Sequence, residues 1–160
     1  MKVLSFGLAA LLLIAGGANA QSAGSGTLNG ADRIKARGCG KETSALSVAF
    51  TLDGGGAWTA TADGDVFSGT STTSGRTTSL TLDGASQSLL GAVVEDLASD
   101  LCEDTVTVNS LGVTKARLKL NKRRTSAKLE FKAIGTGSSS AGTSTGSYRI
   151  KAKGAWTLAP

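Results

Sequence analysis

Histidine is absent from the 160-residue sequence. Without an imidazole, the chain cannot form a Ser-His-Asp or Cys-His nucleophile system, a histidine-ligated zinc site, or a group that titrates near neutral pH without a large shift in its pKa. The sequence also lacks clusters of cysteines or carboxylates at the spacing of metal ligands. It therefore predicts a protein that is not an enzyme and that binds no metal or other cofactor.

Some catalytic chemistry needs no histidine, namely carboxylate-pair and Ser-Lys catalysis. Most aspartates, however, fall in Asp-Gly turns or on one helix face. Asp63-Gly64-Asp65 spaces two carboxylates as a calcium-binding loop does, but the further ligands of such a loop do not follow. Asp-Gly between two strand-like runs is a hairpin signal, so we expect a turn here and not a calcium site.

Long apolar runs are missing except at the N-terminus. There, Lys2 precedes an almost unbroken apolar stretch from Val3 to Ile14, and Ala18-Asn19-Ala20 has small residues where a signal peptidase reads them. The stretch is shorter than the roughly 20 residues that span a bilayer. We therefore predict that residues 1–20 are a signal peptide, cleaved near Ala20. The mature protein is expected to be secreted or periplasmic and not to span a membrane.

Cysteine is scarce, with only Cys39 and Cys102 in the chain. An even number of cysteines in an exported protein favours a disulfide. This bridge would tie the segment before the first predicted strand to the end of a predicted helix. The alternative is a pair of buried free thiols.

Alternation of apolar with polar or small side chains, the pattern of a strand with one buried face, recurs along the chain. It predicts strands at residues 44–52, 58–62, 66–71, 76–82, 105–108, 113–120, 127–133 and 148–152. Residues 21–33 have no periodicity and predict a flexible lead-in, so a single β-rich domain is expected over residues 34–160. The Gly/Ser/Thr tract over residues 135–147 has no core-forming residues and predicts a flexible loop at its centre.

Between Ser86 and Leu101 the apolar residues change to helical spacing, which predicts one amphipathic helix with Asp83 or Ser86 as its N-cap. Sequential hairpins need no long crossovers, and closure of a sheet removes its exposed edges. We therefore predict a mainly β fold, an antiparallel meander that forms a closed or partly closed barrel of about seven to nine strands with the helix inserted mid-chain. A two-sheet β-sandwich is the alternative.

Charge divides the chain into two parts. Between Glu42 and Asp104 there are ten acidic residues and one basic residue, whereas Thr105 to Pro160 holds eleven basic residues and one acidic residue. Alternation directs eight of the basic side chains outward from three strands that we expect to be neighbours. These candidate anion-binding residues are Lys115, Arg117, Lys119, Lys128, Lys132, Arg149, Lys151 and Lys153.

Two functions remain open on the sequence alone. One is an envelope or extracellular protein that binds an anionic polymer or an acidic partner through the basic sheet face. The plainer interpretation of that face is a solvated sheet surface, where Lys and Arg are ordinary. Stacking recognition of single-stranded nucleic acid is not expected, because these strands carry no exposed aromatic residues. The alternative function is a carrier of a small apolar ligand in the cavity of the barrel.

Overall fold

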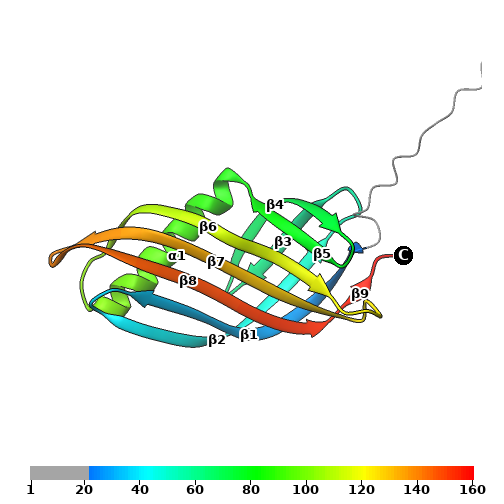
Figure 1. Ribbon diagram of the computed structural model, residues 1–160, viewed down its shortest axis with the longest axis horizontal. Coiled ribbons are helices and arrows are strands. Elements are labelled where there is room, and N and C mark those ends of the chain that lie inside the picture. Colours follow the sequence, from blue (N-terminus) through cyan, green and yellow to red (C-terminus); the bar gives the residue numbers. More distant parts are fainter. Residues whose placement is uncertain (1–21) are drawn as a thin grey trace, which may run out of the picture.

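The alternating segments form antiparallel strands that pair in chain order. The computed structural model describes residues 22–160, and in this range the elements are β1 (Gly24–Ala36), β2 (Gly40–Leu52), β3 (Ala57–Ala62), β4 (Asp65–Ser74), β5 (Thr77–Leu82), α1 (Gly84–Cys102), β6 (Thr107–Leu120), β7 (Ser126–Ser139), β8 (Gly142–Ala155) and β9 (Thr157–Leu158). Each strand from β1 to β7 pairs with the next, and β8 pairs with β1, which closes an eight-stranded barrel (Figure 1). The short β9 adds one extra strand on β1. The predicted barrel with one mid-chain helix is confirmed against the sandwich alternative.

The N-terminal boundary of the domain differs from the prediction. The expected flexible lead-in at residues 21–33 is wrong, because β1 begins at Gly24 and pairs along its whole length with β2. The described part of the domain therefore starts before Ile34. Large apolar residues are sparse in this strand, where Leu28 and Ile34 are the only leucine and isoleucine, and this sparseness hid the two-residue period.

Glycine in β1 has a packing role instead of a role in flexibility. At Gly30, a Cβ atom would clash with the carbonyl oxygen of Lys151 on β8. Only glycine lets the two backbones approach so closely. The same residue type that indicates a flexible segment in the sequence is thus what allows β1 to close the barrel.

The Gly/Ser/Thr tract is also regular structure. The loop predicted at the centre of residues 135–147 is only a short turn, because β7 continues to Ser139 and β8 begins at Gly142. Ser139 and Gly142 face each other across a tight turn. Backbone hydrogen bonds of the ladder need no apolar side chains, and threonine favours extended backbone, so the strands continue through a tract without core-forming residues.

The predicted signal peptide, residues 1–20, lies outside the described residues and stays a prediction. Among residues 22–160, no helix combines the length and the apolar character needed to cross a bilayer.

The disulfide between Cys39 and Cys102 is confirmed, with 4.9 Å between the two Cα atoms. Cys39 lies in the turn between β1 and β2 instead of before the first strand, because β1 itself was missed. Cys102 is the last residue of α1. The bridge thus ties one end of the barrel to the C-terminus of the helix, and it is typical of proteins in an oxidising compartment.

The strands of the barrel differ in length, which leaves room for the helix. β6, β7 and β8 have 14 residues each, whereas β3 and β5 have six each. Figure 1 shows α1 behind the long strands β6, β7 and β8. Asp83 caps the helix as predicted, since its side chain accepts a 2.7 Å hydrogen bond from the backbone of Ser86. Leu90, Val94 and Ala98 form the buried face of α1.

The core fills the interior of the barrel and includes the buried face of α1. Phe50 and Trp58 stack with their ring centroids 5.6 Å apart, and Trp156 packs at a tilt against Phe50. Leu52 and Leu118 are almost fully buried beside them in the same apolar cluster. Burial of each such side chain stabilises the fold by roughly 1.5–3 kcal/mol, so this packed core stabilises the barrel.

Candidate functional site

The eight predicted anion-binding residues lie on one outer wall of the barrel. β7 pairs with β6 on one side and with β8 on the other, so the three strands are neighbours as expected. Inward positions such as Leu118, Leu129 and Ala152 are buried, and the alternate positions therefore point outward. The structure brings together the whole predicted set: Lys115, Arg117, Lys119, Lys128, Lys132, Arg149, Lys151 and Lys153.

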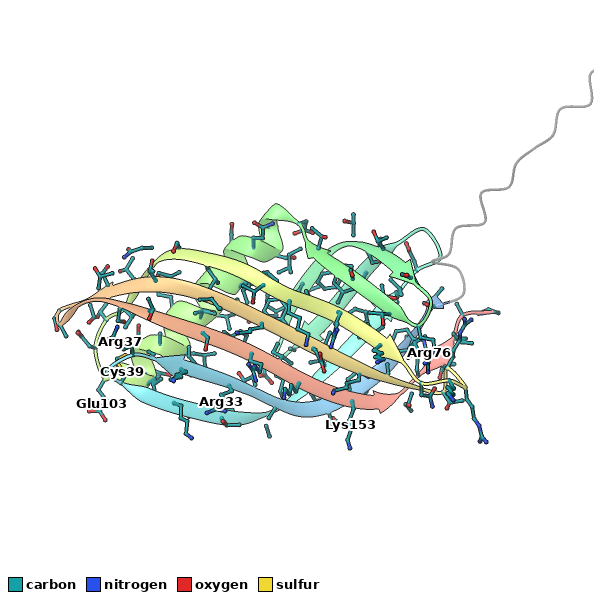
Figure 2. The ribbon with its side chains drawn as sticks, in the orientation of Figure 1. Arg33, Arg37, Cys39, Arg76, Glu103 and Lys153 are labelled. Atoms are coloured by element: carbon teal, nitrogen blue, oxygen red, sulfur yellow. A yellow bond between two sulfur atoms is a disulfide. The ribbon has the colours of Figure 1, made fainter. Side chains whose placement is uncertain are left out.

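Strands β1 and β2 extend this wall with three more cations. Arg33 on β1 lies directly opposite Arg149 on β8, and Lys35 on β1 lies opposite Lys41 on β2. Arg33 and Lys153 both project from the outer side of the barrel (Figure 2). We call the eight predicted residues together with Arg33, Lys35 and Lys41 the basic face. The sequence alone did not place these three cations on the sheet, because β1 was not recognised as a strand.

One row across the basic face contains only cations. Lys115, Lys132, Arg149 and Arg33 lie at facing positions on four consecutive strands. Facing side chains on adjacent strands stand about 4.5–5.5 Å apart at their Cβ atoms, and like charges in such pairs destabilise a sheet. Repulsion between the side chains of this row therefore lowers the stability of the sheet in the free protein.

A single carboxylate lies among these cations. Glu130 on β7 contacts Lys115 at 2.6 Å, Arg117 at 2.7 Å and Lys128 at 2.9 Å. Hydrogen bonds from Lys115, Lys128 and Arg117 lower the pKa of Glu130 well below its usual range. Glu130 is therefore ionised at neutral pH and neutralises part of one side of the face.

The other cations of the face have no such partner. Within the described range, residues 22–160, no carboxylate forms an ion pair with Lys132, Arg149 or Arg33. The same holds for the remaining cations of the face: Lys119, Lys151, Lys153, Lys35 and Lys41.

The acidic residues are placed elsewhere in the molecule. Asp96 and Asp100 lie on α1, and Asp53 and Asp63 lie in turns. The outward positions of β3 and β5 carry threonine, serine or alanine. The acidic part of the sequence thus does not cover the basic face, and the positive field of that face is not cancelled by its neighbours in the barrel.

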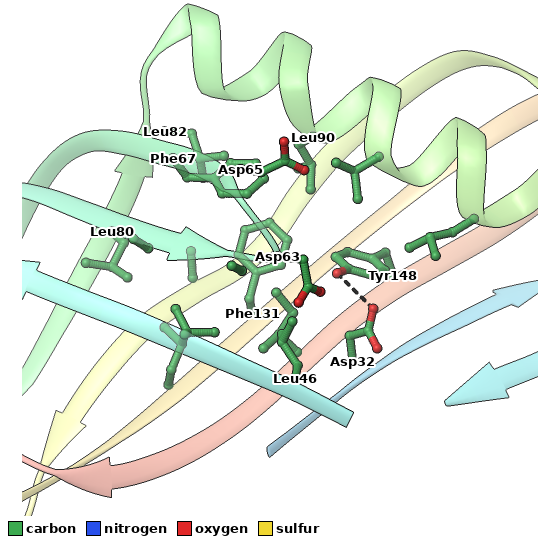
Figure 3. Close-up of a pocket in the computed structure, with 18 of the residues that line it drawn as sticks. Asp32, Leu46, Asp63, Asp65, Phe67, Leu80, Leu82, Leu90, Phe131 and Tyr148 are labelled. Carbon is green, nitrogen blue, oxygen red and sulfur yellow. Dashed lines mark hydrogen bonds between the residues drawn. The ribbon is translucent and has the colours of Figure 1, made fainter. Parts of the chain in front are cut away.

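A second feature is a cavity of about 290 Å³ inside the barrel, between the strands and α1 (Figure 3). Its walls are mostly apolar and include Trp58, Phe67, Phe131 and Leu90. Asp32 and Tyr148 meet in the cavity, where the Tyr148 hydroxyl donates a 3.1 Å hydrogen bond to Oδ2 of Asp32. Burial, followed by the charge of Asp32, raises the pKa of Tyr148 well above its usual range, so the hydroxyl stays a donor.

Sequence reasoning missed Asp32 as a functional candidate. It falls in the segment predicted to be flexible, yet it shares the inward face of β1 with Leu28, Ile34 and Ala36. A two-residue period carrying one aspartate among apolar residues was the available signal. Asp63 and Gly64 form the predicted hairpin turn between β3 and β4, and Asp65 is the first residue of β4. Both aspartates also line the cavity.

Comparison with known proteins adds little. No family model matches the chain, and no curated protein matches it. One solved structure, a redesigned beta barrel, is similar over 82% of this chain and 92% of its own, with 16% sequence identity and a TM-score of 0.32. Similarity at this level supports no conclusion about function.

Proposed function

We propose that this protein is an exported, non-enzymatic envelope or extracellular protein that binds an anionic polymer through the basic face. The single observation that carries the proposal is the row of Lys115, Lys132, Arg149 and Arg33, in which four cations face one another across four strands and only Lys115 forms an ion pair with a carboxylate, that of Glu130.

A merely solvated sheet surface would not need such a row. Mixed charges of both signs serve solubility without repulsion between neighbours, and like charges directly opposite one another lower the stability of a sheet. A polyanion would remove that repulsion on binding and would release the counterions that it carries in solution. The repulsion in the free protein thus becomes part of the driving force for association.

The spacing of the cations suits an extended polymer. Adjacent strands are about 4.8 Å apart and outward residues along a strand about 6.7 Å apart, so the face is a grid of positive charges at the separations of sulfate, phosphate or carboxylate groups on a linear chain. Aromatic stacking platforms are absent from the outward positions of these strands. Binding would therefore be electrostatic and strongly dependent on salt.

The test is retention on immobilised heparin, a linear polyanion, in a rising salt gradient. The variant Arg33→Gln, Lys132→Gln, Arg149→Gln removes three charges from the face. Arg33 and Arg149 are exposed and Lys132 is half-buried, and substitutions at exposed positions usually change stability by about 0.5 kcal/mol or less each. We expect it to elute at clearly lower salt than the parent. The matched control is Arg76→Gln, Lys122→Gln, Arg123→Gln, which removes three charges from turns beyond the face and is expected to elute close to the parent.

Two outcomes would overturn the proposal. If both triple variants shift equally, net charge alone governs retention and the face has no special role. If neither shifts, the basic face is only a solvated surface. Circular dichroism and the thermal midpoint of each variant show whether a change in retention reflects binding or loss of fold.

A further inference from the structure

The cavity inside the barrel is as one-sided in charge as the outer face, but with the opposite sign. None of the residues that line it is a lysine or an arginine. Four are aspartates: Asp32 from β1, Asp63 and Asp65 at the β3–β4 turn, and Asp96 from α1. The rest of the wall is apolar apart from the hydroxyl of Tyr148. A cavity that bound only neutral apolar ligands would not need four carboxylates in its wall.

Asp32 is the buried member of the four, with only 9% of its surface exposed. Its Oδ2 accepts the hydrogen bond from Tyr148. Among the described residues, no other side chain or backbone group donates to this carboxylate. Buried carboxylates in proteins are normally paired with a cation, because burial removes the water that stabilises their charge. Within residues 22–160, no lysine or arginine forms an ion pair with Asp32.

The other three aspartates of the cavity wall lie nearer to solvent than Asp32. Asp65 is half-buried, whereas Asp63 and Asp96 are exposed, so the cavity opens between the β3–β4 turn and α1. In Figure 3 the Asp63 carboxylate lies beside the Asp32–Tyr148 pair, and its charge acts on the Tyr148 hydroxyl. The negative groups thus form a path from solvent to the buried carboxylate, which would attract cations and repel anions.

The apolar part of the wall is preformed. The indole of Trp58 donates hydrogen bonds to the backbone carbonyl oxygens of Thr70, at 2.9 Å, and Thr81, at 3.2 Å, which fixes its ring across β4 and β5. Phe131 packs edge-on against Tyr148 at a centroid distance of 6.5 Å. Aromatic faces attract ammonium groups as well as apolar surface, so the walls and the carboxylates favour the same kind of ligand.

We propose that this cavity binds a small organic cation that carries an apolar body. Its ammonium group lies against Asp32 and Asp63, and its aryl or short alkyl body lies between Trp58 and α1. The volume of about 290 Å³ is near the lower end for small-molecule sites, which run from roughly 300 to 1,000 Å³, and so admits one small amine. The site is distinct from the basic face and does not depend on the function proposed for that face.

Isothermal titration calorimetry with matched probes tests this ligand class. The probes are 2-phenylethylammonium, its neutral counterpart 2-phenylethanol, the anion phenylacetate, and hexyltrimethylammonium as an alkyl cation. We expect at least one of the two cations to bind about tenfold or more tightly than the alcohol, because 2-phenylethylammonium donates charged hydrogen bonds to the carboxylates and hexyltrimethylammonium is attracted by their charge and by the aromatic faces. Phenylacetate is expected not to bind.

Variants locate the binding in the cavity. Asp32→Asn is expected to remove the preference for the cation while the alcohol binds as before. Asp63→Asn is a second variant that keeps the fold, because Asp63 has a φ of 51° and asparagine tolerates this left-handed conformation. Asp96→Asn on the cavity wall has its matched control in Asp100→Asn, one turn further along α1 and outside the lining. Of these two helix variants, only Asp96→Asn is expected to weaken binding of the cation.

Three results would overturn the proposal. Equal binding of 2-phenylethanol and 2-phenylethylammonium would assign the cavity to neutral apolar ligands. Failure of both cations to bind at millimolar concentrations would show that the cavity is not a site for organic cations. An unchanged affinity for the cation in both Asp32→Asn and Asp63→Asn would place any binding outside the cavity.

Discussion

Tyr148 and Asp32 lie 116 positions apart in the sequence, and the hydroxyl of one donates a 3.1 Å hydrogen bond to the carboxylate of the other inside the barrel. The contact joins β8 to β1, the pair of strands that closes the barrel. Both residues are buried. The hydrogen bond thus lies where the first and last long strands of the fold meet.

Replacing Tyr148 by phenylalanine should destabilise the protein. The change leaves a buried acceptor without its donor, which costs roughly 1–3 kcal/mol. Urea unfolding measures the loss, and the double variant Tyr148→Phe, Asp32→Asn is its control: there the penalty should be smaller than the sum of the two single changes. Additive effects of the single changes would mean that the hydrogen bond carries no coupling energy.

The disulfide should supply a large share of the stability. It closes a loop between residues 63 positions apart, and the chain-entropy account assigns about 4 kcal/mol to a loop of this length. The variant Cys39→Ser, Cys102→Ser should therefore unfold at much lower urea than the oxidised parent. Identical midpoints for the variant and the oxidised parent would show that the bridge adds nothing to the fold.

Glu130→Gln should strengthen the binding of polyanions. The carboxylate pairs with Lys115, Arg117 and Lys128, and its removal frees three cations while raising the charge of the face by one. Later elution from heparin than the parent is the expected result. Earlier elution would indicate that Glu130 acts chiefly by holding the cations in place.

The same variant makes a prediction about pH. The folded-state pKa of Glu130 is lowered, so its ion pairs stabilise the protein above the unfolded-state pKa, about 4.3, and this stabilisation is lost as pH falls further toward the folded-state value. The difference in unfolding free energy between the parent and Glu130→Gln should be constant from neutral pH to about pH 5.5 and shrink below about pH 4. A difference that grows on acidification would contradict the sign of this linkage.

The sequence predicted the elements that carry large apolar residues at regular spacing. Residues 44–52 alternate through Leu46, Val48 and Phe50, and all three side chains are buried in β2. α1 was predicted in the same way from its helical spacing, and its Asp83 cap was one of the two candidates.

The missed elements are those whose stability comes from the backbone ladder. β1 and the paired ends of β7 and β8 are rich in Gly, Ser and Thr, so no local pattern separates them from a loop. Their partners are distant in the chain, as Gly30 opposite Ala152 illustrates. The buried carboxylate of the cavity was missed for the same reason, since Asp32 lies on β1. Eight of the residues of the basic face were predicted from the sequence. The register of β1 against β8 adds Arg33 opposite Arg149 and so completes the row of four cations.

If the basic face binds polyanions as a surface, the salt dependence of the affinity should change when cations are removed from it. A labelled heparin oligosaccharide is titrated at several salt concentrations with the parent and with Arg33→Gln, Lys132→Gln, Arg149→Gln. If the three side chains contact the polymer, the slope of log K against log salt should become shallower by about two to three, because each neutralised anionic group contributes roughly 0.7–0.9 to the slope. An unchanged slope and affinity in the triple variant would contradict the account.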